Sequence, residues 1–312
     1  MKDISIIGAT SHLGVHLVDH LVGLGCNINA SYRVSDRIPT AWKTNDLINC
    51  VRVDLNEEKP AFDFLRTERV IWLAHLDQGR FNEREAEVNL RPFKCFLRIA
   101  QDSPVRQITF ISSGGSVYGE ARKLPISENH PRDPISSYGK AKKAMEDALL
   151  EFARSSGVHV AVVRPGNIYG FEDPLRNSKG IVGAFLDSMS NRTPFTLIDE
   201  GRTVRDFIHV DDVCAAIATA LLDEQKEKIW NAATGVPSKI SHILDLIALS
   251  SPLARPEFIH RPNYSSDVQT NVLSIERITS ESAWRPKVDI ETGIDTAVKN
   301  WMNSVSLLPQ TV

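Results

Sequence analysis

Short apolar runs alternate with segments of helical periodicity through the first two thirds of the chain. The apolar runs predict buried strands at residues 4–7, 28–32, 50–53, 70–74, 108–112 and 158–164. Between them, apolar residues recur at helical spacing over residues 13–22, 89–100 and 138–154. Pro60 predicts a helix start, and the pair Ser103 and Pro104 predicts a helix stop. Strands that alternate with helices are typical of a parallel sheet with crossover helices, so we expect an α/β fold.

The alternation of strand and helix patterns becomes less regular after Arg164, where Pro and Gly residues mark loops between shorter strand and helix signals. A strand signal at 229–232 indicates that part of the later chain returns to the first sheet. We therefore expect two parts, a larger one over residues 1–165 and a smaller, C-terminal α/β part over residues 166–312.

Composition and charge narrow the classes of function. The 312 residues are 42% hydrophobic and 24% charged, which is ordinary for a globular protein. A formal net charge of −3 and a pI near 6.3 give no basic field of the kind that nucleic acid requires. No apolar run approaches the ~18 residues of a membrane span, so we expect a cytoplasmic protein that binds neither nucleic acid nor membrane. The four cysteines are scattered, which predicts reduced packing residues and no metal site.

Tyr138 and Lys142 stand one helical turn apart in the sequence Tyr-Gly-Lys-Ala-Lys. Residues four apart share one face of a helix, so the Lys142 ammonium can lie beside the Tyr138 phenol. A free tyrosine has a pKa near ~10, and a neighbouring cation lowers it by favouring the phenolate. The pair therefore predicts a general acid/base that exchanges a proton with a sugar-type hydroxyl. The spacing alone is also common by chance in amphipathic helices.

A Gly-rich turn follows the first predicted strand, with Gly8 and Gly14 at its ends. Such a turn at the start of a helix places backbone N–H groups against a pyrophosphate, which indicates a dinucleotide-binding, Rossmann-type fold. The middle glycine of the usual pattern is Ser11 here, a residue small enough for close approach and able to donate its hydroxyl to phosphate.

The end of the second strand favours NADP over NAD. An acidic residue is expected there when the adenosine ribose is held through its 2′-hydroxyl. Arg33 stands at this place instead, with Arg37 close behind, and an arginine can stack on adenine and meet a 2′-phosphate. Asp36 could still reach the ribose, so NAD stays open. Asp54, after the third strand, is the expected partner of the adenine amino group.

In chain order, these motifs resemble those of the extended short-chain dehydrogenase/reductase family, in its nucleotide-sugar epimerase/dehydratase branch typified by UDP-glucose 4-epimerase. The resemblance covers nearly the whole chain. It rests on residues 8–14, Ser-Ser-Gly-Gly-Ser-Val-Tyr-Gly at 112–119, the Tyr-Lys helix at 138–142, Arg-Pro-Gly-Asn-Ile-Tyr-Gly at 164–170 and Arg-Asp-Phe-Ile-His-Val-Asp-Asp at 205–212.

The resemblance implies that Tyr138 is the catalytic base at the sugar 4-hydroxyl and that Lys142 holds the nicotinamide ribose. The usual Ser or Thr partner falls on Gly114, so Ser113 or Ser116 must supply the hydroxyl, and we expect Ser113 to do so. The implied cofactor contacts are Gly8, Thr10, Ser11, His12, Leu13, Gly14, Arg33, Asp54, Leu55, Leu73, Ala74, Asn89, Ser112, Tyr138, Lys142 and Pro165. The implied substrate contacts are Ser113, Gly114, Ser116, Tyr138, Asn167, Arg205, Arg261 and Asp267.

Two missing acids narrow the reaction. Family 4,6-dehydratases resemble one another in an Asp-Glu pair before Val-Tyr-Gly, and decarboxylating members have a glutamate there. Gly115 and Ser116 occupy these positions and cannot titrate. This leaves hydride exchange at one carbon, and we expect a UDP-hexose-type 4-epimerase. The alternative is an NADPH-dependent 4-keto-6-deoxy nucleotide-sugar reductase, and a less favoured one is a non-catalytic dinucleotide sensor. The resemblance also implies a homodimer that forms a four-helix bundle through residues 89–100 and 140–154.

Overall fold

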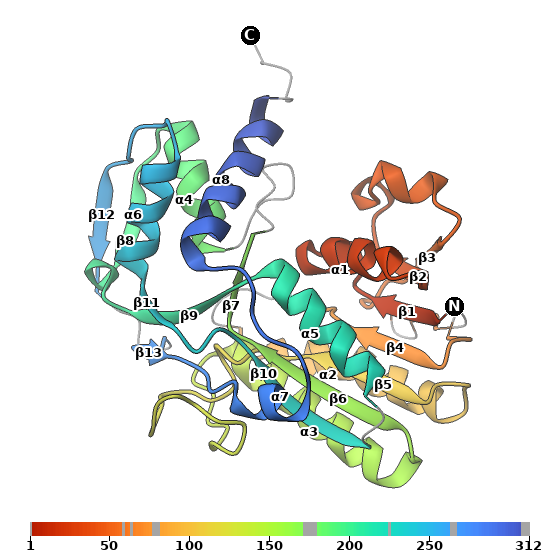
Figure 1. The fold of residues 1–312 in the computed structure, drawn as a ribbon. Helices are drawn as coiled ribbons and strands as arrows, with labels where there is room; N and C mark the ends of the chain where they lie inside the picture. The colour runs from red at the N-terminus through yellow and green to blue at the C-terminus, as the bar shows by residue number, and fades with distance from the viewer. Residues whose placement is uncertain are drawn as a thin grey trace.

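The computed structural model describes residues 2–57, 60–62, 65–76, 82–170, 180–223, 226–262 and 267–306. Seven parallel strands form its central sheet in the order β10, β6, β5, β4, β1, β2, β3 (Figure 1). Their bounds are β1 (Asp3–Ile7), β2 (Asn27–Tyr32), β3 (Ile48–Arg52), β4 (Arg69–Trp72), β5 (Gln107–Ile111), β6 (His159–Pro165) and β10 (Glu227–Ala232). The strand order reverses at β1, which has β2 on one side and β4 on the other. The expected doubly wound, Rossmann-type fold is therefore confirmed.

Helices cover both faces of this sheet. One face carries α1 (His12–Gly23) and α5 (Val210–Leu222), and the opposite face carries α2 (Glu85–Gln101) and α3 (Ser137–Ser156). The central strands β4 and β5 are largely buried on both sides for this reason. In β4, Ile71 belongs to the core under α1 and α5, whereas Val70 and Trp72 belong to the core under α2 and α3.

The predicted elements lie within a few residues of the observed ones, with one exception. Pro60 does not start a helix, because the described residues around it, 60–62 and 65–68, form no helix. Phe62 and Leu65 are buried against Trp72 and Phe96 instead, so this segment is held by tertiary packing without regular structure.

The C-terminal half builds a second group of elements beside the sheet. β7 (Asn167–Tyr169), β9 (Val204–His209), β11 (Pro237–Lys239) and β13 (Thr270–Asn271) form one small sheet, and β8 (Phe195–Ile198) pairs with β12 (Phe258–Arg261). α4 (Ile181–Asn191), α6 (Ile240–Ser250) and α8 (Ile290–Ser306) pack around a separate apolar core, and the short α7 (Glu276–Glu281) lies against β10. No helix in the described ranges is long and apolar enough to cross a membrane.

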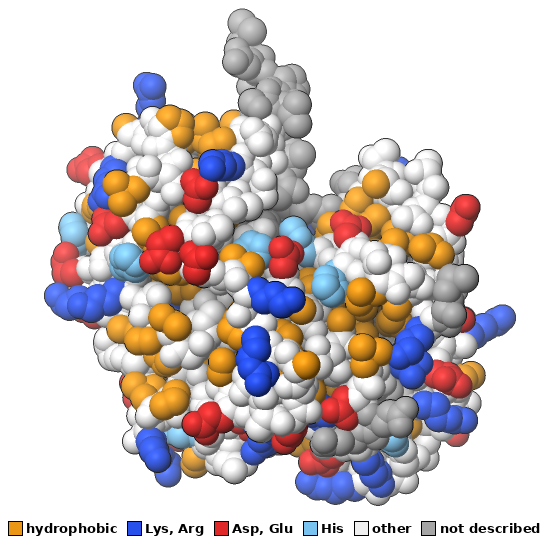
Figure 2. All heavy atoms as spheres, in the orientation of Figure 1, with side chains coloured by type: hydrophobic (Ala, Val, Ile, Leu, Met, Phe, Trp, Pro, Cys, Tyr) orange, Lys and Arg blue, Asp and Glu red, His pale blue; other side chains and the backbone are white. Residues whose placement is uncertain are grey.

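Basic and acidic side chains are mixed over the face shown in Figure 2, without a continuous basic stripe among its described residues. This distribution agrees with the nearly balanced composition of 36 Lys and Arg against 39 Asp and Glu.

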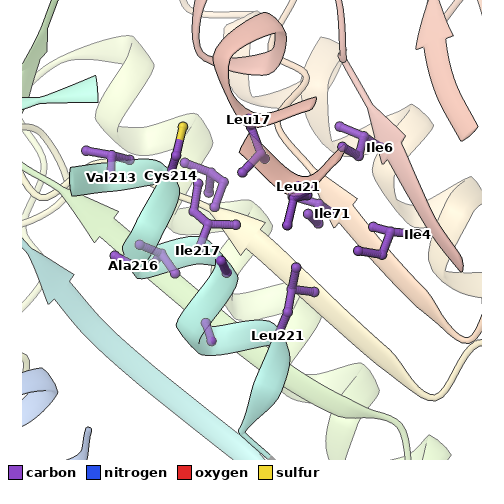
Figure 3. Close-up of a cluster of buried hydrophobic side chains, with 14 of the residues drawn as sticks. Ile4, Ile6, Leu17, Leu21, Ile71, Val213, Cys214, Ala216, Ile217 and Leu221 are labelled. Atoms are coloured by element: carbon purple, nitrogen blue, oxygen red, sulfur yellow. The ribbon is translucent and has the colours of Figure 1, made fainter. Parts of the chain in front are cut away.

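α5 is the helix that joins the two halves of the chain. It leaves β9 of the small sheet and packs against α1 and the central sheet, as its contacts with Leu17, Leu21 and Ile71 show (Figure 3). The small residues Ala216, Ala218 and Ala220 allow this close approach, since all three are buried.

Two consecutive leucines at the end of α5 test the contribution of this core. Leu221 is 3% exposed and Leu222 is 61% exposed. We expect Leu221→Ala to lower the free energy of unfolding by about 2–5 kcal/mol because it leaves a cavity. Leu222→Ala, the matched control, should change it by less than about 0.5 kcal/mol. Urea denaturation measures both, and equal losses would contradict the assigned packing.

Candidate active site

The predicted cofactor residues meet at one edge of the central sheet. Since the strands are parallel, their carboxyl ends share an edge, and this edge carries the residues that follow each strand. These are Gly8 after β1, Arg33 after β2, Asp54 after β3, Leu73 after β4, Ser112 after β5 and Pro165 at the end of β6.

The turn after β1 is so tight that only glycine fits its two ends. Gly8 has a φ of +90°, and a Cβ there would lie 2.8 Å from the backbone nitrogen of Ala74. A Cβ on Gly14 would lie 2.4 Å from the carbonyl oxygen of Ala9. Both distances are far inside van der Waals contact, so the turn packs backbone against backbone and leaves its outer side open.

Ser11 caps α1. Its Oγ accepts a hydrogen bond of 3.1 Å from the Gly14 N–H, while the Gly8 N–H donates to Ser31 Oγ at 2.8 Å. The Ser11 hydroxyl retains its own hydrogen for donation. Thr10, His12 and Leu13 complete the turn and are half-buried.

The residues that follow β2 and β3 differ in their exposure and contacts. Arg33 is exposed directly after β2. Asp54 Oδ1 accepts hydrogen bonds of 3.0 Å from the backbone N–H and the side-chain amide of Asn56, which fixes the loop after β3. Leu55 is 7% exposed and belongs to the core under α2 and α3.

Asn89 holds the loop that follows β4. Its amide group accepts from the Leu76 N–H at 2.7 Å and donates to the carbonyl oxygens of Leu76 and Glu85, both at 2.9 Å. The loop starts from the N–H groups of Leu73 and Ala74, which both donate to the Ile7 carbonyl at 2.9 and 3.1 Å. The Asn89 side chain therefore stabilises the cofactor edge through this loop.

Tyr138 and Lys142 lie on the first turns of α3, which Ser136 caps by accepting from the Gly139 N–H at 3.1 Å. Lys142 Nζ lies 5.7 Å from the centre of the Tyr138 ring and donates to the Ile111 carbonyl at 2.9 Å. Burial lowers the pKa of Lys142 to about 8, against the opposing effect of the Glu146 carboxylate. Lys142 thus carries its positive charge in a nearly water-free place beside the phenol.

The serine loop, residues 112–119, follows β5 at the same edge of the sheet. Gly114 is locked by its N–H, which donates to the Pro165 carbonyl at 2.8 Å, and by its carbonyl, which accepts from Asn271 Nδ2 at 3.0 Å. A Cβ on Gly114 would lie 2.4 Å from Leu273 Cδ1. A serine in that slot would require Leu273 to shift, and its Cβ would also lie 3.0 and 3.1 Å from the carbonyl oxygens of Arg164 and Pro165.

Five of the eight predicted substrate residues line a cavity of about 500 Å³, to which they come from different elements. They are Ser113, Ser116, Asn167, Arg205 and Asp267, and Gly115 lines it as well. The remaining lining comes from 166, 168, 180–182, 195–198, 203, 207 and 240. Gly114, Tyr138 and Arg261 are not among the lining residues, and Arg261 is exposed at the end of β12.

Arg205 is ion-paired inside this cavity. Its Nη2 lies 2.7 Å from Asp267 Oδ1, and its side chain is only 8% exposed, against 35% for Asp267. Backbone carbonyls of Val204 and Gln269 also accept from this guanidinium. The pair presents both a cation and an anion to a ligand.

Sequence reasoning missed the buried network behind α3. Glu146 accepts from Arg164 Nε at 3.0 Å and from its Nη2 at 2.6 Å, and Arg164 Nη1 donates to the Tyr118 hydroxyl at 2.8 Å. Burial raises the pKa of Tyr118 to about 12, so this phenol stays neutral. Glu146 follows Lys142 by one further turn, and that spacing was the available signal.

Sequence reasoning also missed the ring that packs against Tyr138, which comes from the segment after β4. The His75 ring lies 4.6 Å from the Tyr138 ring, centre to centre. No motif in the sequence joins these residues. Across the described residues, no group of three His, Cys, Asp or Glu side chains is placed to hold a metal ion, and the four cysteines are free.

Known proteins are similar in sequence to this chain over nearly its whole length. A Methanocaldococcus jannaschii protein named "Putative UDP-glucose 4-epimerase" is 30% identical over 96% of this chain and 98% of its own. The dTDP-4-dehydro-6-deoxyglucose reductase of Escherichia coli is 24% identical over 95% and 96%. The crystal structure of Thermus thermophilus UDP-glucose 4-epimerase in complex with NAD superposes with a TM-score of 0.84 at 26% identity, covering 97% of this chain and 100% of that one.

The sequence model of a single family matches residues 4–233, a span that includes the Gly-rich turn, the serine loop, the Tyr138–Lys142 helix and Arg205. This span is more than half of the chain. The chain therefore belongs to the NAD-dependent epimerase/dehydratase family.

Proposed function

We propose that the protein is a nucleotide-sugar 4-epimerase of the UDP-hexose type. The observation that carries this proposal is the Tyr138–Lys142 pair, which shares the end of the sheet with a cavity lined by small hydroxyl residues and one buried arginine. The names of the relatives support it, since most of those similar over the full length are UDP-sugar epimerases.

The cofactor edge fits a nicotinamide dinucleotide. Gly8 and Gly14 form a cradle that any side chain would fill, and the buried Ser112 Oγ lacks a hydrogen-bond partner among the described residues. We propose that the Gly8–Gly14 turn holds the pyrophosphate, that Lys142 and Ser112 lie at the nicotinamide ribose, and that Asp54 faces the adenine. The bound dinucleotide would accept hydride from C4 of the sugar and return it.

The chain's own residues move the proton. Tyr138 takes the proton of the C4 hydroxyl during oxidation and returns it after the sugar has turned over, and Lys142 favours the phenolate in between. Ser113, with Ser116 beside it, binds the sugar oxygen through its hydroxyl. The Gly114 slot cannot serve, because glycine has no side-chain hydroxyl. The absence of a titratable group at Gly115 and Ser116 disfavours loss of water or of carbon dioxide.

Three lining residues of the cavity suit the nucleotide part of the substrate. We propose that Arg205 binds the diphosphate, with Asn167 between sugar and phosphate and Asp267 at the nucleoside ribose. Arg205 then exchanges part of its contact with Asp267 for the phosphate oxygens, which a guanidinium binds well. Arg261 is exposed at the end of β12, where it would join the phosphate from the rim.

We further propose the division of labour expected from the sequence, with cofactor binding in residues 1–165 and substrate binding mainly in 166–312. We also propose a homodimer through α2 and α3. These helices lie side by side on one face of the sheet, and they carry half-buried apolar residues that belong to none of the apolar cores, such as Val88 and Ala144.

A reductase of 4-keto-6-deoxy nucleotide sugars is the second candidate. It is favoured by Arg33, exposed where a 2′-phosphate would lie, and by the reductase among the relatives. The purified protein decides between the two. An epimerase interconverts UDP-glucose and UDP-galactose without added NADPH, as proton NMR would show, whereas a reductase consumes NADPH in proportion to a 4-keto sugar.

Replacing Tyr138 with Phe should lower kcat by about 10³-fold or more, because the general base is lost. Binding of the dinucleotide, measured by isothermal titration calorimetry, should stay within about threefold, since the ring remains. Turnover at the wild-type rate would refute the assigned base and leave only a binding role for the site.

Replacing Lys142 with Met should remove a pH-dependent cost of folding. Between pH 8 and about 10.5, the unfolded chain keeps a proton that the folded protein has released, so wild-type stability rises with pH over this window. The stability advantage of Lys142→Met should therefore shrink by about 3 kcal/mol as the pH rises through it. Urea denaturation at pH 7 and pH 10 tests this, with Lys143→Met as the matched control. A constant difference would contradict the buried ammonium.

Replacing Arg33 with Ala should weaken NADP⁺ binding about tenfold and leave NAD⁺ binding within about twofold, because only NADP⁺ has the 2′-phosphate. Competition binding with the two dinucleotides measures the ratio. Arg154→Ala, which removes an exposed charge at the end of α3, is the control. Equal losses for both dinucleotides would exclude Arg33 from cofactor discrimination.

A further inference from the structure

We propose that His75, held in place by Glu85, is a positioning residue that fixes the ring of Tyr138. His75 follows β4 on the cofactor edge, and its ring meets the Tyr138 ring at 4.6 Å between centres with an angle of 73° between the planes. This edge-to-face arrangement is one that aromatic pairs prefer. The inference rests on the proposed role of Tyr138 as the acid/base.

Glu85 determines how the imidazole ring is turned. Its Oε1 lies 2.7 Å from His75 Nε2, and the two side chains are 3% and 13% exposed, respectively. A carboxyl group buried to this degree needs a hydrogen-bonded partner, so breaking the contact is costly. The short distance and the burial together leave the ring little freedom to rotate.

The backbone around His75 is fixed as well. On one side, the Ala74 N–H donates to Ile7, next to the Gly8 turn. On the other side, the Asn89 amide binds both the N–H and the carbonyl of Leu76. His75 is thus a restrained side chain on a backbone that is fixed at both neighbouring residues, and it contacts Tyr138 from a different element than Lys142 does.

The contacts of Lys142 and His75 with the Tyr138 ring bear on the reaction. Tyr138 is half-buried in the first turn of α3, where Lys142 lies 5.7 Å from its ring centre but makes its hydrogen bond to Ile111. Proton transfer depends on placing the phenol oxygen to within a fraction of an ångström, and a displacement of about 1 Å can cost about 100-fold in rate. The His75 ring supplies the steric contact that keeps the phenol at the sugar position.

Two glutamine substitutions separate the ring contact from the hydrogen bond. His75→Gln retains an amide that can bind Glu85 but removes the ring, whereas Glu85→Gln retains both the ring and its partner. We expect His75→Gln to lower kcat about 10- to 100-fold with KM unchanged within about twofold, because ground-state binding is not touched. Glu85→Gln keeps the ring but weakens the contact that orients it, so kcat should fall less than in His75→Gln. His130→Gln removes a similar ring contact, 5.8 Å from Tyr118 on another loop, and is the matched control with an expected kcat within about threefold.

A crystal structure of His75→Gln provides the readout that does not depend on activity, and the Tyr138 ring should occupy a different rotamer there. The proposal is overturned if the ring is unmoved, if kcat is unchanged, or if His130→Gln loses as much as His75→Gln. If the wild-type protein does not interconvert UDP-hexoses, the proposed function fails on its own, and the ring position in the variant still decides whether His75 positions Tyr138.

Discussion

The buried ion pair between Glu146 and Arg164 is the interaction on which the rest of the site depends. It joins α3 to β6 through two hydrogen bonds, and both side chains are at most 1% exposed. The same guanidinium holds the Tyr118 hydroxyl, which donates in turn to Asn231 of β10. The helix with the acid/base, the serine loop and the returning strand are thus fastened at a single point. Loss of one partner would leave an uncompensated charge in the core.

This pair also explains how a buried lysine is tolerated on the same helix. Burial disfavours the Lys142 ammonium, and the Glu146 carboxylate one turn further opposes that effect. Glu146 itself is shared with Arg132 at 2.8 Å, so the balance of charge around α3 involves several groups. The site therefore keeps a cation beside the phenol at the expense of stability, as catalytic groups often do.

Local sequence patterns predicted the sheet well, because strands buried on both faces read as continuous apolar runs. They also predicted the Gly8–Gly14 turn, whose glycines are required by backbone contact within the chain segment itself. What the sequence could not supply is the direction of a side chain across the fold. The resemblance placed the usual hydroxyl slot at Gly114, which has none, and only the structure shows that Ser113 and Ser116 line the cavity. The contact of His75 with Tyr138 joins residues without any periodic relation, and only the folded sheet edge brings them together.

The contacts of Gly114 with Asn271 and Leu273 have a consequence for how the protein is made. All the residues proposed for proton transfer lie at or before Lys142 in the chain. The loop that carries Ser113, however, is closed by side chains about 160 positions further along the chain. A ribosome-bound chain that ends before β13 lacks these contacts of the loop. The loop takes the geometry of the full-length fold only after the segment around β13 has been translated and has docked.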